Sequence, residues 1–132
     1  PGCVYMPPAE THVEIASDWG LRLVRQEKGE LCPSVDRLFC SLAGALTATK
    51  QNAGQPVPQV VGAVLTGMGR DGADGVSALA RAGAVTVAQD GASSVVDGMP
   101  RAAREAGAAH TVGLTEMAPR LIEWLAGTGR RR

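Results

Sequence analysis

The order of apolar and polar positions along the chain predicts both strands and helices. Residues 11–16 and 21–25 alternate polar and apolar side chains, and the turn-like residues 17–20 join them, so this part is expected to form a β-hairpin with one face in water. Residues 60–65 and 84–88 are apolar without alternation, a pattern typical of strands that are buried on both faces of a parallel sheet.

Apolar residues with a period of 3.6 predict a helix that opens at Pro33-Ser34. They are Val35, Leu38, Phe39, Leu42 and Leu46. A second helix is expected to follow Gly72 and to end at Gly83, because glycine commonly terminates helices. Its inward residues are expected to be Val76, Leu79 and Ala80.

Two more helices are expected in the last third of the chain. One runs from about Pro100, a residue suited to the first turn of a helix, to Gly107. The other starts at Thr115, and its apolar face is formed by Met117, Leu121, Trp124 and Leu125. Strands and helices that alternate through short links form βαβ units. The chain is therefore predicted to be an α/β domain with a parallel sheet, an antiparallel hairpin near its start and one bare sheet edge.

The composition excludes several classes of function. The 132 residues suffice for one domain, and 13 basic side chains balance 13 acidic ones, so no net charge attracts nucleic acid or an anionic membrane. Cys3, Cys32 and Cys40 form no metal-ligand pattern with the two histidines, and neither a metal nor a cofactor is expected. The terminal arginines are expected to lie in a disordered basic tail over residues 127–132. Because the chain begins with Pro1 and not with Met, we expect a fragment or a processed product.

A glycine-rich turn carries the clearest chemical signal. Residues 67–72, Gly-Met-Gly-Arg-Asp-Gly, match GxGxxG between a predicted strand and a predicted helix, and Asp90 ends the next strand, which is the spacing of a dinucleotide site. A fixed carboxylate at Asp71 would repel a pyrophosphate, whereas a helix N-terminus would stabilise Asp71 as a capping acid. The same position would allow Asp71 to orient a histidine in a nucleophilic triad. The residues alone favour the cap first, the triad acid second and the nucleotide site third.

Three stretches of the chain resemble one known family. Residues 65–72, LTGMGRDG, closely resemble the LTGMGxDG signature of the chemotaxis protein-glutamate methylesterases, the CheB family. Residues 33–39, PSVDRLF, are similar to the start of a helix in that family, and residues 88–90 and 98–101 are similar to its AQ-acid and GMPR segments. All stand in the order and spacing of the family, and the similarity covers nearly the whole chain.

The resemblance implies a fold, an activity and a site. Residues 1–126 would be the C-terminal part of a catalytic domain with a doubly wound, mainly parallel sheet, whose N-terminal strands precede this chain. In the family, a serine, a histidine and an aspartate hydrolyse methyl esters of receptor glutamates, and many members also deamidate glutamines. The aspartate would be Asp71, and Gly67, Met68 and Gly69 would line the substrate and oxyanion side. The serine and histidine would precede Pro1, so this chain alone is expected to be inactive.

The resemblance also implies partners and leaves alternatives open. The partners would be the cytoplasmic helices of methylated chemoreceptors, and many members carry an upstream receiver domain; the location would be the cytoplasm. The alternatives are a receptor-docking module without chemistry and the dinucleotide-binding βαβ protein. Cys32, Gly91 and Asp97 depart from the residues common in the family, which makes receptor recognition the property most open to change.

The remaining candidates for chemistry have ordinary structural explanations. His12 is expected to be a surface or turn residue and not a catalytic base, and His110 is expected to be equally inert. Ser93 and Ser94 lack a Gly-x-Ser-x-Gly elbow, so they are expected to belong to a loop that covers the site.

Overall fold

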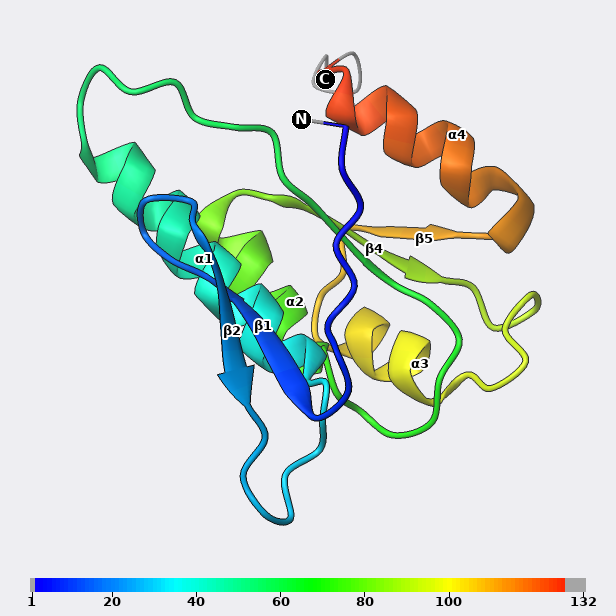
Figure 1. Cartoon of the computed structure of the whole chain (residues 1–132). Helices are drawn as coiled ribbons and strands as arrows, with labels where there is room; N and C mark the ends of the chain where they lie inside the picture. Colours follow the sequence, from blue (N-terminus) through cyan, green and yellow to red (C-terminus); the bar gives the residue numbers. More distant parts are fainter. Residues whose placement is uncertain (1, 128–132) are drawn as a thin grey trace.

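Three parallel strands form the central sheet in the order β3-β4-β5 (Figure 1). They are β3 (Val61–Val64), β4 (Val85–Gln89) and β5 (His110–Val112). The computed structural model describes residues 2–127 of the chain. Within these residues β4 has a partner on both sides, whereas β3 pairs only with β4. In the described part of the chain, the sheet edge along β3 is therefore bare, as the sequence predicts.

Helices lie on both faces of this sheet (Figure 1). α2 (Ala73–Ala82) connects β3 to β4, α3 (Gly98–Glu105) connects β4 to β5, and both pack on the same face. α4 (Leu114–Leu125) follows β5 and packs on the opposite face. α1 (Val35–Gln51) packs beside α2 and contributes to the core on the same face. The prediction of an α/β fold with a doubly wound, parallel sheet is confirmed.

The antiparallel hairpin near the start of the chain is also confirmed. Its strands, β1 (Thr11–Ile15) and β2 (Leu21–Arg25), lie beside α1 (Figure 1). Two hydrogen bonds attach the hairpin to the helix: the Ile15 N–H donates to Ser41 Oγ at 2.9 Å, and the Trp19 indole N–H donates to Thr49 Oγ1 at 2.8 Å. Most of β2 is exposed, which agrees with one face of the hairpin in water.

The apolar core has two parts, one on each face of the sheet. The larger part lies under α1, α2 and α3 and is formed by Phe39, Ala43, Leu46, Val60, Val64, Val76, Leu79, Ala82, Ala88 and Ala103. The smaller part lies under α4 and is formed by Val87, Met117 and Trp124. Successive residues of a strand face opposite sides, so Val87 contributes to one part and Ala88 to the other. β4 is thus buried on both faces, as its apolar sequence predicts.

Several expectations about individual positions are wrong. β3 is not buried on both faces, because Val61 and Ala63 are only half-buried on the α4 side of this edge strand. Ala80 is half-buried, since it lies beside the inward stripe of α2. Leu125 is 56% exposed, because α4 ends there and turns that side chain to solvent. Except for Gly127, the expected basic tail lies outside the described residues.

The two helices α1 and α2 approach closely at Gly75. A Cβ atom added at Gly75 would lie 2.5 Å from Phe39 Cβ and 3.3 Å from Asp36 Cα. Both of these atoms belong to α1, and Phe39 is part of the core. The absence of a side chain at this position is therefore required for the packing of the two helices.

We expect Gly75→Ala to lower the free energy of unfolding by about 1–3 kcal/mol, the usual cost of adding volume to a packed contact. Gly44→Ala is the matched control, because Gly44 is an exposed residue of α1 with nothing within 4 Å of an added Cβ atom. That control should raise the stability by about 0.5–1 kcal/mol, since alanine favours helix formation. Urea unfolding followed by circular dichroism measures both, and equal effects of the two changes would contradict the close approach.

Candidate functional site

The loops that follow the three parallel strands meet at the carboxyl edge of the sheet, where α/β proteins place their sites. The loop after β3 contacts the loop after β4 through Gly67, whose N–H donates to the Val96 carbonyl at 2.9 Å and whose carbonyl accepts from the Met99 N–H at 2.8 Å. Thr66 Oγ1 accepts from the Val96 N–H at 2.9 Å. The glycine-rich turn is thus held against its neighbour by two backbone hydrogen bonds and by the hydroxyl of Thr66.

Gln89, at the end of β4, connects the first two loops directly and the third through Ser93. Its side chain is buried, with 1% of the residue exposed. Oε1 accepts from the Thr66 N–H at 2.9 Å, and Nε2 donates to the Ser93 carbonyl at 2.8 Å. Ser93 Oγ in turn accepts from the Leu114 N–H at the start of α4, at 3.0 Å. One buried amide side chain therefore sets the relative positions of the loops.

An ion pair completes this edge. Arg104 of α3 donates through Nη2 to Asp97 Oδ2 and through Nη1 to the Gln89 carbonyl, both at 2.6 Å. Asp97 Oδ1 is buried without a hydrogen-bond partner among the described residues. The hydrogen bond from Arg104 lowers the pKa of Asp97, and the hydroxyl and amide of Ser93 lower the pKa of Asp90. Both carboxyl groups are therefore ionised at neutral pH, and each is bound to a neighbour.

Asp71, the predicted catalytic residue, lies in the same turn and binds the N-terminus of α1. Oδ2 accepts from the Val35 N–H at 2.7 Å, and Oδ1 accepts from the Asp36 N–H at 2.9 Å and from Ser34 Oγ at 3.2 Å. The first N–H groups of a helix have no partner within the helix, and the positive end of the helix dipole favours a carboxylate. Asp71 is therefore a cap, but of α1 and not of α2, the helix that follows it in the sequence. The interpretation of Asp71 as a capping acid is correct, but the helix that it caps is not the one that follows the turn.

The N-terminus of α2 is bound by a carboxylate of α1 in the same way. The carboxylate of Asp36, in the first turn of α1, accepts from the Gly75 N–H of α2 at 2.7 Å. Gly72, the N-cap of α2, makes no side-chain capping bond and has φ of 96°, a left-handed conformation that glycine adopts without strain. The two helices thus cap each other reciprocally: Asp71, which precedes α2, binds the N-terminus of α1, and Asp36 of α1 binds the N-terminus of α2.

The carboxylate of Asp71 keeps capacity for one more donor. A carboxylate has about four acceptor positions, and three donors to Asp71 are found among the described residues. Asp71 is half-buried, and Oδ2 accepts one hydrogen bond where Oδ1 accepts two. Such a fixed carboxylate is suited to bind the N–H of an imidazole.

The other predicted site residues surround Asp71 in the sequence and differ in exposure. Met68 is 86% exposed, so its side chain is free to contact a ligand. A Cβ atom at Gly67 would lie 2.6 Å from Met99 Sδ, and Gly69 has φ of 94°. The turn therefore depends on glycine for its close approach to α3 and for its backbone conformation. The predicted role of these three residues toward a substrate stays a prediction.

The expectation that His12 is a surface or turn residue is wrong. His12 is completely buried, because the loop that precedes α1 folds over the imidazole. Its Nδ1 accepts from the Ser34 N–H, and its Nε2 lies 3.2 Å from Glu30 Oε2. His110 is half-buried and stacks on Trp124 of α4 with 4.6 Å between ring centroids, which agrees with a structural role.

Ser34, His12 and Gln89 are functional candidates that the motif alone does not reveal. Ser34 opens a helix in the sequence, but its contact with Asp71 joins segments 37 residues apart. The only signal for Gln89 is a polar residue at the end of an apolar strand. The expected loop around Ser93 does lie at the carboxyl edge of the sheet, where it binds Asp90.

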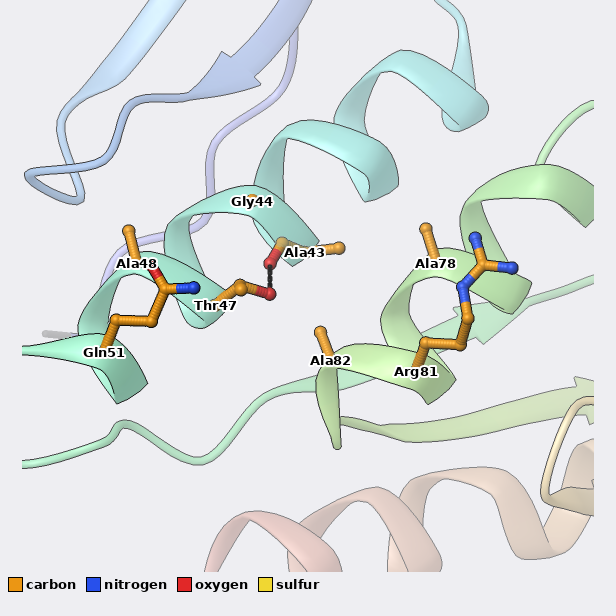
Figure 2. A pocket seen from close by; sticks show the side chains of 8 residues that line it. All are labelled: Ala43, Gly44, Thr47, Ala48, Gln51, Ala78, Arg81 and Ala82. Atoms are coloured by element: carbon orange, nitrogen blue, oxygen red, sulfur yellow. Dashed lines mark hydrogen bonds between the residues drawn. The ribbon is translucent and has the colours of Figure 1, made fainter.

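A separate groove lies between the second halves of α1 and α2 (Figure 2). It has a volume of about 400 Å³ and is lined mainly by small side chains, among them Ala43, Ala78 and Ala82, with Arg81 at its border. α2 ends near the amino ends of the strands, so this groove lies at the opposite end of the fold from Asp71. It contributes nothing to the candidate site.

Two further properties concern only the part of the chain that the structure describes. No group of three or more His, Cys, Asp or Glu side chains in residues 2–127 could hold a metal ion. Within the same residues, no helix has the length and apolar character needed to cross a membrane.

Comparison with known proteins finds one family. The family model described as CheB methylesterase matches residues 1–121. A protein-glutamate methylesterase/protein-glutamine glutaminase of Syntrophotalea carbinolica is 42% identical over 131 residues, with 96% of this chain and 34% of the relative covered. One of Xanthomonas campestris pv. campestris is 46% identical, with 92% of this chain and 33% of the relative covered. The chain therefore spans about a third of the length of these relatives.

A solved structure agrees with the sequence comparisons. The crystal structure of the Thermotoga maritima CheB methylesterase catalytic domain matches with a TM-score of 0.74 and 26% sequence identity. The match covers 93% of this chain and 62% of the other, so the fold described above corresponds to a part of that domain.

We expect Gln89→Leu to lower the free energy of unfolding by about 1–3 kcal/mol, because the Thr66 N–H and the Ser93 carbonyl lose the partner that the buried amide gives them. Gln55→Leu, at an exposed glutamine, is the control and should change the stability by less than about 0.5 kcal/mol. Urea unfolding measures the difference. If the two variants were equally stable, the buried amide would not hold the loops together.

We expect the stabilising effect of the Asp97–Arg104 pair to depend on pH. The pKa of Asp97 is lowered from 3.8, so the stabilisation is complete above that value and is lost as the pH falls below it. The stability difference between the unaltered protein and Asp97→Asn should be constant between about pH 7 and pH 5 and should shrink below pH 3.8. Urea unfolding at each pH measures it, and a constant difference down to the acid limit would contradict the ion pair.

Proposed function

Because this chain belongs to the CheB methylesterase family, we propose that the protein containing it hydrolyses the methyl esters of glutamate side chains on chemoreceptors. The curated relatives are named protein-glutamate methylesterase/protein-glutamine glutaminase, and we extend the proposal to the deamidation of receptor glutamines. Since the chain spans about a third of those relatives, residues 1–126 are proposed to be the C-terminal part of the catalytic domain.

The observation that carries this proposal is the fixed carboxylate of Asp71. Three donors hold it at the carboxyl edge of the sheet, and Oδ2 has one acceptor position without a donor among the described residues. In a Ser-His-Asp mechanism, that position accepts the Nδ1–H of the catalytic histidine, sets its tautomer and stabilises the imidazolium that forms when the serine is deprotonated. The bare edge of β3 lies beside this turn and is where further strands of the sheet would bring the serine and the histidine.

Ser34 and His12 do not form a triad with Asp71, although all three lie close together. The Ser34 hydroxyl donates to Asp71, whereas His12 Nδ1 accepts from the Ser34 backbone N–H and His12 Nε2 pairs with Glu30. No imidazole nitrogen is therefore placed to take the proton of that hydroxyl. The nucleophile and the base are proposed to come from segments other than residues 1–132.

The turn residues Gly67, Met68 and Gly69 are proposed to line the substrate and oxyanion side of the site. A backbone without side chains at Gly67 and Gly69 allows an ester carbonyl to approach the turn. The exposed Met68 side chain would contact the apolar part of a methylated glutamate side chain. The proposed partners are methylated receptor helices and an upstream receiver domain, and the proposed location is the cytoplasm.

The dinucleotide alternative conflicts with the hydrogen bonds of the turn. The Gly75 N–H donates to Asp36, and the Ala73 N–H donates to the Arg70 carbonyl at 3.1 Å, so these amides are not free for a pyrophosphate. Asp90 Oδ1 already accepts two hydrogen bonds from Ser93, so this oxygen is occupied within the loop. A receptor-docking module without chemistry remains the second candidate, because the exposed side chain of Met68 is equally suited to binding.

We expect Asp71→Asn, in the product of the complete reading frame, to lower methanol release from methylated receptor by about 10⁴-fold, as for triad aspartates elsewhere. Asp74→Asn is the control, since Asp74 is an exposed acid nearby whose side chain pairs only loosely with Arg70 at 3.5 Å. It should leave the rate within about twofold, because changes at exposed positions have small effects. Normal methanol release by the Asp71 variant would disprove its catalytic role, and receptor binding without methanol release would favour the docking module.

A further inference from the structure

We propose that His12 is a positioning residue of the site: its imidazole fixes the N-terminus of α1, which in turn holds Asp71. The proposal rests on the proposed function, because it assigns His12 to the positioning of the catalytic acid. It rests on a geometry that neither the motif nor the comparisons describe, a chain of hydrogen bonds from the hairpin to the glycine-rich turn.

The imidazole of His12 uses both nitrogens in a completely buried position. Nδ1 is 3.2 Å from the Ser34 backbone nitrogen, which can only donate, so Nδ1 is the acceptor. Nε2 then carries the proton and donates to Glu30 Oε2 at 3.2 Å. The tautomer follows from these two partners.

Ser34 transmits the position of His12 to Asp71. Ser34 is the N-cap of α1 with an extended backbone, φ −98° and ψ 123°, so its own N–H points outside the helix and needs a partner. His12 supplies that partner. The Ser34 hydroxyl accepts from the Arg37 N–H at 3.3 Å and donates to Asp71 Oδ1 at 3.2 Å. A change at His12 therefore acts on the cap, and the cap acts on Asp71.

Glu30 holds the other side of the imidazole. Its Oε2 accepts from the Glu27 N–H at 3.0 Å, and its Oε1 lies 3.3 Å from Arg37 Nη1 of α1. The hydrogen bond from Glu27 lowers the pKa of Glu30, and His12 and Arg37 act in the same direction. Arg37 also pairs with Glu14 of β1 at 2.9 Å. The imidazole is thus held between a carboxylate and the cap, and both are bound to α1.

Two substitutions separate the roles of the two nitrogens. In His12→Asn, the side-chain oxygen reaches the place of Nδ1 and keeps the acceptor for Ser34, but the bond to Glu30 is lost. In His12→Gln, the side-chain nitrogen reaches the place of Nε2 and keeps the bond to Glu30, but the acceptor for Ser34 is lost. Both variants keep a buried amide, so their difference reports which of the two bonds, to Ser34 or to Glu30, positions the site.

The first measurement is amide hydrogen exchange at Val35 and Asp36, whose N–H groups donate to Asp71. In the product of the complete reading frame, we expect His12→Gln to accelerate exchange at both amides by about tenfold, as expected for local opening. We expect His12→Asn to leave both amides protected. Acceleration in the Asn variant alone would show that Glu30, and not Ser34, is the important partner and would overturn the proposal.

The second measurement is methanol release from methylated receptor. We expect kcat of His12→Gln to fall about 10- to 100-fold, the usual loss when an outer-shell partner is removed, with KM unchanged. His12→Asn should restore most of kcat, a rescue that a role in packing alone would not produce. If kcat were equal in the two variants, the proposal would be wrong.

A third variant tests whether the charge of Glu30 matters when both hydrogen bonds of His12 are kept. Glu30→Gln keeps an acceptor for Nε2 and leaves the bond from Ser34 to Nδ1 intact. It should therefore keep Val35 protected and kcat within about threefold, because the ion pair that it removes is partly exposed to solvent. A larger loss would again assign the effect to Glu30 and contradict the proposal. If the unaltered protein released no methanol, the proposed function would fail, while the exchange measurement would still decide the role of His12.

Discussion

The reciprocal capping of α1 and α2 by two carboxylates is the interaction on which the rest of the structure depends. The first amides of each helix have no acceptor within that helix. Asp71, before α2, accepts from the first amides of α1, and Asp36 of α1 accepts from an amide of α2. The reciprocal capping requires the two N-termini to lie side by side, which the missing side chain at Gly75 allows. Because α2 follows β3 directly, the capping also places the N-terminus of α1 at the carboxyl edge of the sheet.

This constraint explains why a catalytic acid would be placed here. A carboxylate on a free loop loses precision through motion, whereas one held by two backbone amides and a hydroxyl has a defined position. A carboxylate in a defined position is what the orientation of an imidazole requires. The interaction that packs the helices and the interaction that would prepare the site are therefore the same, and a change to one affects the other.

Much of the fold could be predicted from local pattern, and the site only in part. The hairpin and the helix after Pro33 follow from periods of two and 3.6, and β4 follows from a continuous apolar run, because these patterns depend on near neighbours in the sequence. The helix that Asp71 caps could not be predicted. The Val35 N–H, which donates to Asp71, lies 36 residues away in the sequence, and its approach depends on tertiary packing. The prediction for β3 is wrong for a related reason: its apolar sequence indicates two buried faces, but among the described residues β3 has a neighbouring strand on one side only.

The burial of His12 shows most clearly what a local pattern omits. Histidine at an alternating position of a hairpin indicates a residue near solvent, and nothing in residues 11–16 indicates otherwise. The loop that carries Glu30 and the cap at Ser34 close over the ring, and each gives one nitrogen a partner. A buried polar ring that is fully satisfied in this way costs little, whereas one left with a single partner is destabilising. The two bonds that compensate the burial of His12 also fix the α1 cap and, through it, Asp71. The position of Asp71 should therefore depend on which nitrogen of His12 a substitution removes.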